Sequence, residues 1–160
     1  MHRLLRAAPL AVLVLATAAC SQGVEVPLPD PAPSGAAAFT CASLHSGLPD
    51  HVDGQGVTAS TPVSSWTSAW GDPAITLRCG VPTPAALKPD SQLLVVDGVS
   101  WLPEQLTAGY RFTTVDREVN VEVVVPSKYN PEADALADIS PIVADKVSAT
   151  GSATPTPTSS

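Results

Sequence analysis

The cysteine at position 20 most constrains how this chain can fold, because it ends a leader for export and so decides the compartment in which folding occurs. Arg3 and Arg6 precede an apolar stretch over residues 7–16, and three small residues lead to Cys20. This order of segments is typical of a secretory signal peptide. The apolar stretch is about half of the ~20 residues that a transmembrane helix needs. We therefore expect residues 1–19 to be a signal peptide that is removed.

The sequence Thr17-Ala18-Ala19-Cys20 resembles the lipobox of bacterial lipoproteins, in which the cysteine thiol receives diacylglycerol before cleavage. Thr17 departs from the pattern at a position where Leu is commoner. An ordinary secretory cleavage, with Cys20 incidental, is the alternative. One acyl chain binds membranes only marginally, so a stable anchor requires several, such as palmitate chains. We expect lipid on Cys20 to hold the protein to the extracytoplasmic face of the cell membrane.

The charge of the mature chain limits its partners. Removing residues 1–19 leaves six basic and fifteen acidic residues, a formal charge of −9. An acidic surface argues against nucleic acid as a partner and against adhesion to anionic headgroups. The membrane contact is therefore expected to depend on lipid and not on charge.

The two remaining cysteines, Cys41 and Cys79, are expected to form a disulfide in an oxidising compartment. Apolar residues recur at helical spacing over residues 41–48, with Thr40 as a possible N-cap, and alternate over residues 75–81 as in a half-buried strand. Cys41 lies on the apolar side of the predicted helix and Cys79 on that of the strand, so both thiols face one core. A bridge closing 38 positions stabilises the fold by roughly 4 kcal/mol in the chain-entropy model.

Composition divides the mature chain into three parts. Residues 20–38 are rich in Pro, Ala and Gly and are expected to be a spacer, in which residues 21–38 span at most ~60 Å at ~3.3 Å per residue. Residues 148–160 are Ser, Thr, Ala, Pro and Gly after the last apolar position and are expected to be disordered. The globular domain is expected over residues 39–147.

Within that domain the sequence predicts an α+β fold. Residues 50–68 are polar and are expected to be mostly loop. Two hairpins are expected, one over residues 93–101 around Asp97-Gly98 and one over residues 111–125. Helical spacing over residues 131–147 is interrupted by Pro141, which predicts a kink or two short helices. We expect a small single domain with one antiparallel sheet of about 4–6 strands, short helices packed on one face, and one disulfide.

Four segments resemble an actinobacterial envelope lipoprotein family, domain of unknown function 3515. The most specific covers residues 70–81, WGDPAITLRCGV; the others are residues 96–101, VDGVSW, residues 112–117, FTTVDR, and residues 121–126, VEVVVP. The likeness spans residues 40–146. It implies an exported, often lipid-anchored domain of unassigned activity and supplies no catalytic residues.

The polar residues of the domain offer weak support for chemistry. Asp50, His51 and Asp53 lie close together, with His45 on the preceding helix, but a zinc site needs three or four converging ligands. No Gly-x-Ser-x-Gly or Ser-x-x-Lys motif is present, and Cys41 and Cys79 lack the spacing of a redox pair. We therefore predict no catalytic residue, no metal and no cofactor.

A binding surface is predicted around Trp70, Asp72 and Arg78. Trp and Arg dominate binding hot spots when they are exposed, and the turn at Trp70-Gly71-Asp72-Pro73 would hold Trp70 near the surface. The other reading places the tryptophans in a core with few aromatic residues. It is favoured for Trp101, while Trp70 remains open between the two.

Together these features favour a non-enzymatic binding or support module of the bacterial cell envelope, whose partner is an envelope protein or a cell-wall component. The alternative is an envelope hydrolase that acts on cell-wall material, with a polar loop site near His51.

Overall fold

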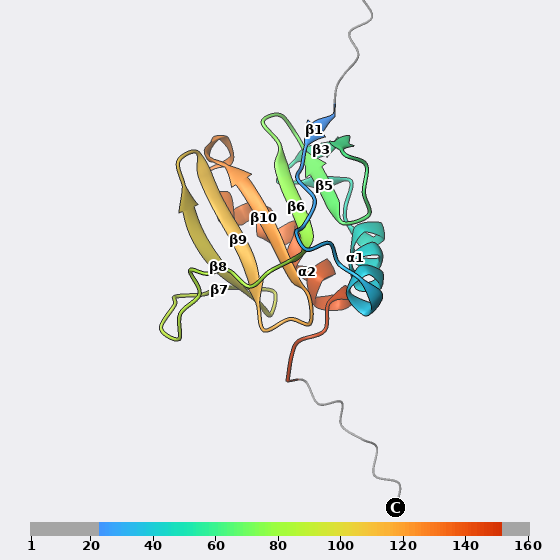
Figure 1. Ribbon diagram of the computed structural model, residues 1–160. Helices are drawn as coiled ribbons and strands as arrows, with labels where there is room; N and C mark the ends of the chain where they lie inside the picture. Colours follow the sequence, from blue (N-terminus) through green and yellow to red (C-terminus); the bar gives the residue numbers. More distant parts are fainter. Residues whose placement is uncertain (1–22, 152–160) are drawn as a thin grey trace, which may run out of the picture.

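The computed structural model describes residues 23–151, which form an α+β domain built on one antiparallel sheet (Figure 1). Within these residues the sheet has eight strands, more than the 4–6 expected, and every neighbouring pair is antiparallel. The predicted class is confirmed. The strands, in order across the sheet, are β2 (His51–Val52), β3 (Gln55–Thr58), β5 (Thr67–Trp70), β6 (Ile75–Val81), β10 (Asn120–Pro126), β9 (Gly109–Val115), β8 (Val99–Leu106) and β7 (Leu94–Val96).

The additional strands come from the polar segment that was expected to be loop. It contains β2, β3, β4 (Ser60–Thr61) and the start of β5. Asp53 and Gly54 have positive φ values of 49° and 69°, which turn β2 back onto β3. These strands have only two to four residues and few apolar ones, so backbone pairing forms them without the apolar alternation that would make them visible in the sequence.

Two α-helices among the described residues, α1 (Gly35–Gly47) and α2 (Ala135–Lys146), lie on one face of the sheet, as predicted (Figure 1). The Cys41–Cys79 disulfide joins α1 to β6, and its Cα atoms are 5.5 Å apart. Helix α1 begins at Gly35, with Ser34 and not Thr40 at the N-cap. The added turn contains three alanines, which favour a helix but carry no apolar periodicity that could predict it.

Helix α2 runs through Pro141 as one element, so of the two predicted outcomes, a kink or two short helices, the division into two helices is wrong. Two short 3-10 turns, η1 (Ser127–Tyr129) and η2 (Glu132–Asp134), precede it. Proline removes one backbone hydrogen bond, but Leu136, Ile139 and Val143 on both sides of it are fully buried. Their packing against the sheet outweighs the lost hydrogen bond.

The core lies between the helices and the inner face of the sheet, which we define as the face that carries Cys79. Trp101 on β8 is 0% exposed, as predicted. Its Nε1–H donates to Ser140 Oγ on α2 at 3.0 Å, which satisfies both polar groups. Ser140 therefore links the helix to the sheet.

The folded part extends beyond both predicted boundaries of the domain. In the expected spacer, β1 (Val24–Glu25) pairs in parallel with β4, and Val26 is 1% exposed. Residues 26–34 then cross the outer face of the sheet, opposite α2, before α1 begins (Figure 1). At the other end, Ser148 O accepts from Glu118 N at 2.9 Å. The predicted signal peptide, Cys20 and residues 152–160 lie outside the described residues.

Candidate functional site

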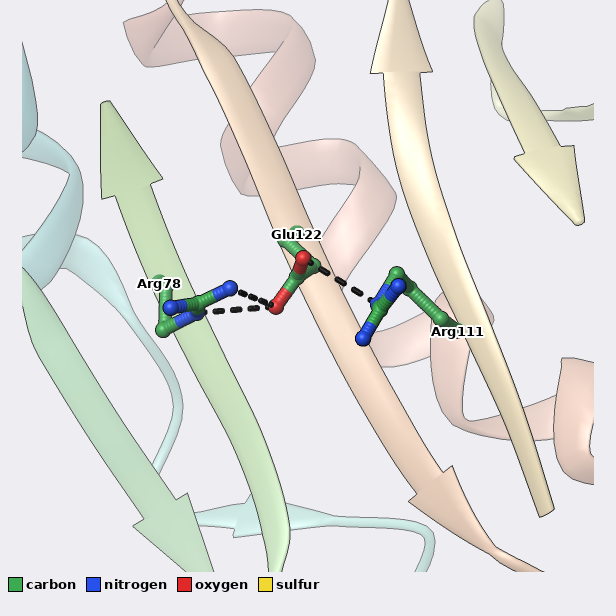
Figure 2. A network of polar contacts seen from close by, with 3 residues as sticks. All are labelled: Arg78, Arg111 and Glu122. Atoms are coloured by element: carbon green, nitrogen blue, oxygen red, sulfur yellow. Dashed lines mark hydrogen bonds and ion pairs between the residues drawn. The ribbon is translucent and has the colours of Figure 1, made fainter. Parts of the chain in front are cut away.

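A cluster of three charged side chains occupies the outer face of the sheet (Figure 2). Glu122 on β10 is opposite Arg78 on β6, and the neighbouring strand β9 contributes Arg111. Glu122 Oε1 accepts from Arg78 Nε at 2.8 Å and forms an ion pair with Arg78 Nη2 at 2.8 Å. Glu122 Oε2 is 3.3 Å from Arg111 Nε. One carboxylate is therefore shared by two guanidinium groups.

The register of the sheet explains this arrangement. Successive side chains of a strand point to opposite faces, and Cys79 faces the helices, so Arg78 must face outward. Glu122 shares the outer face because it is directly opposite Arg78. Its side chain is only 9% exposed, and a carboxylate at that depth needs a charged partner. The side chains of Arg78 and Arg111 are 25% and 37% exposed, so the two arginines, and not the carboxylate, form the part of the cluster that contacts solvent.

A pocket of about 380 Å³ lies over this cluster. Its floor is formed by the three charged residues with Thr113, and Glu104 of β8 lies at its side. The end of β6 and the segment after it, residues 81–86, form a wall of two prolines, two alanines, a valine and a threonine. The site therefore combines a charged floor with a small, largely apolar wall.

Two polar atoms at the floor of this pocket have no hydrogen-bond partner among the described residues. They are Thr113 Oγ1 and Arg111 Nε, and both are buried. The nitrogen lies near Glu122, but the contact is an ion pair and lacks hydrogen-bond geometry. Buried polar groups in proteins are almost always paired, so the floor has unused donor capacity.

The structure separates the three residues of the predicted binding surface. Trp70 is 1% exposed and its Nε1–H donates to Pro49 O at 2.9 Å, so it belongs to the core and not to a surface. Asp72 is exposed in the turn between β5 and β6, and its backbone oxygen accepts from Lys128 Nζ at 2.6 Å. Only Arg78 lies at the pocket. The turn that suggested an exposed Trp70 instead directs its ring toward the helices.

Sequence reasoning missed Arg111 and the pairing role of Glu122. The alternation of valines in residues 119–125 does predict that Glu122 faces outward. The pairing with Arg78, 44 positions earlier, depends on β6 and β10 being neighbours, and no local pattern in the sequence records that.

The polar loop near His51 is a tight hairpin. His51 is exposed on β2, and the backbone N–H of Asp53 donates to Asp138 Oδ2 at 2.8 Å. His45 Nδ1 is 3.0 Å from Ser68 Oγ. Across residues 23–151, no group of three or more His, Cys, Asp or Glu residues is placed to hold a metal ion.

The fold and the pocket define a small, disulfide-bonded α+β domain with a charged site on the outer face of its sheet. The family model for a protein of unknown function, DUF3515, matches residues 4–151, and the chain belongs to this family. Comparisons with curated proteins and with solved structures gave no match. In the part of the chain that the structure describes, no helix has both the length and the apolar character needed to cross a membrane.

Proposed function

We propose that this chain is a lipid-anchored binding module of the bacterial, and by its resemblance actinobacterial, cell envelope. Its ligand contacts lie at the outer-face pocket over Arg78, Glu122 and Arg111. The observation that carries the proposal is this pocket, where two arginines are held around a carboxylate that is 9% exposed. Binding sites in proteins commonly combine a few fixed polar groups with an apolar wall.

The proposed anchor is lipid on Cys20. The leader and the small residues before Cys20 support it, and the disulfide between Cys41 and Cys79 accounts for the other two cysteines of the chain. Replacing Cys20 by Ser should abolish incorporation of radiolabelled palmitate and release the protein from the membrane fraction. Unchanged labelling and retention would contradict the anchor.

The ordered N-terminal segment makes the proposed attachment short. The backbone N–H of Val24 donates to Ala59 O at 2.7 Å, so the chain is fixed to the domain from this residue onward. Cys20 precedes Val24 by four positions, a reach of at most ~14 Å at ~3.5 Å per residue. The binding module is therefore proposed to work close to the membrane, and not at the ~60 Å that a free spacer would allow.

A site-specific cross-linker tests the binding role. A photoreactive residue at Ala86, which is exposed and lines the pocket, is compared in intact cells with one at Ala144, which is exposed on α2. We expect a defined adduct from position 86 alone, lost when Arg78 is replaced by Gln in the same protein. Identical products from both positions, or an adduct that persists in the Arg78→Gln variant, would contradict a binding role for this pocket.

A further inference from the structure

We propose that the outer-face pocket binds a carboxylate carried by a small apolar group, such as the C-terminus of a peptide that ends in alanine. This inference rests on the proposed function as a binding module and names the chemical class of its ligand. It is carried by the donors of the pocket floor, the charge balance around them and the shape of the wall.

The donors of the floor exceed the acceptors. A guanidinium group has five N–H donors, and Arg78 directs those on Nε and Nη2 to Glu122. Within residues 23–151, the side chain of Arg111 donates no hydrogen bond and is 37% exposed where it lines the pocket. Its Nε and the hydroxyl of Thr113 are buried, so the donors that a ligand can reach are those on the two Nη atoms of Arg111. A ligand that brings oxygen acceptors would use these donors.

The charges that line the pocket limit the charge of the ligand. Glu122 is shared between Arg78 and Arg111, which leaves one positive charge in the cluster. Glu104 also lines the pocket, so its four charged groups sum to zero, and a ligand anion would be held by the guanidinium group of Arg111 and not by a net positive charge. Glu104 is opposite Arg111 in the register of β8 and β9, but it forms no ion pair in the described structure. A carboxylate matches the two-pronged geometry of a guanidinium group. A phosphate dianion would meet more repulsion from the two glutamates.

The wall limits what the carboxylate can be attached to. Pro82, Pro84, Ala85 and Ala86 offer short apolar side chains and no charge. The volume of about 380 Å³ is at the lower end of the range for small-molecule pockets, roughly 300–1,000 Å³. A methyl group next to the carboxylate fits such a wall, whereas a long charged side chain finds no partner on it.

Titration with two matched peptides, followed by amide NMR, tests this inference. The probes are N-acetyl-alanyl-alanine and its C-terminal amide, which differ only in the carboxylate, with inorganic phosphate as a third probe. We expect saturable shifts at Arg111 and Thr113 with the acid, and binding weaker by about tenfold or more with the amide and with phosphate. The Arg111→Gln variant should lose a similar factor, while Lys146→Gln, which removes a positive charge on α2, should bind like the unaltered protein.

The inference is overturned if the acid gives no saturable shift, if the amide binds as well as the acid, or if phosphate binds equally. The last result would describe a general anion site. Unfolding curves for both variants separate a loss of binding from a loss of folding. If the peptides fail while the cross-linker at Ala86 still gives an adduct that depends on Arg78, the binding module stands and only the carboxylate class is wrong.

Discussion

Replacing Glu122 by Gln tests how far the sheet depends on the shared carboxylate. The substitution keeps the size of the side chain but leaves Arg78 and Arg111 facing each other without a negative charge. Hydrogen bonds to charged groups contribute about 1.5–3 kcal/mol each, and Gln retains a neutral acceptor for Arg78. The contact with Arg111, whose side chain is 37% exposed, is largely screened and adds about 0–1 kcal/mol.

The expected loss in free energy of unfolding is therefore about 2 kcal/mol, or roughly 8 °C in Tm for a domain of this size. Urea denaturation measures it, with Glu118→Gln as the matched control, because Glu118 is exposed and, among residues 23–151, its carboxylate accepts only from Thr40 Oγ1 at 3.3 Å. A cycle with Arg78→Gln should give a coupling of about 1 kcal/mol or more. If Glu122→Gln and Glu118→Gln lose the same small amount, the cluster is only a solvated surface feature and the reasoning fails.

Three further outcomes follow from the fold. Replacing Cys41 and Cys79 by Ala should lower the free energy of unfolding by about 4 kcal/mol, since the bridge closes 38 positions; an unchanged urea midpoint would contradict this. Gly109→Ala should lower the free energy of unfolding by more than ~3 kcal/mol or prevent folding, because the φ of Gly109 is +138° and a Cβ atom would lie 2.1 Å from the backbone oxygen of Val125. Normal yield and stability of this variant would contradict the register of β9. Thr67→Val should raise the free energy of unfolding by about 1 kcal/mol, since its buried hydroxyl has no partner among the described residues, whereas a loss would mean that the hydroxyl is satisfied.

The sequence predicted the elements whose two faces differ. Along β6, buried residues such as Cys79 alternate with less buried ones, and this period of two residues can be recognised in the sequence because one face of the strand is apolar. A turn signal located the hairpin at β7–β8, because Asp97 and Gly98, which take positive φ values of 48° and 74°, are typical of a tight turn. The alternating valines of residues 119–125 located the second strand of the β9–β10 hairpin. The strands β2 and β3 lack this contrast, so the sequence made them indistinguishable from a loop.

The site was less predictable than the fold. Arg78 was identified because it faces outward on a recognisable strand, but Arg111 has meaning only once β9, β10 and β6 are known to be neighbours. The turn before β6 suggested an exposed Trp70, and this failed because turn residues report the direction of the backbone and not the depth of a side chain. The indole N–H of the buried Trp70 donates to Pro49 O, 21 positions away, a contact that no local pattern in the sequence records.

The placement of the tryptophans separates the fluorescence signal of unfolding from the signal of ligand binding. Trp70 and Trp101 are buried on the inner face, Trp66 packs partly buried against the same core, and none of the three lines the pocket over Glu122. Intrinsic fluorescence should therefore follow loss of the packed core and stay nearly silent when the outer face is occupied. The protein thus carries its own reporter of unfolding, which leaves the emission of a labelled ligand free to report occupancy alone.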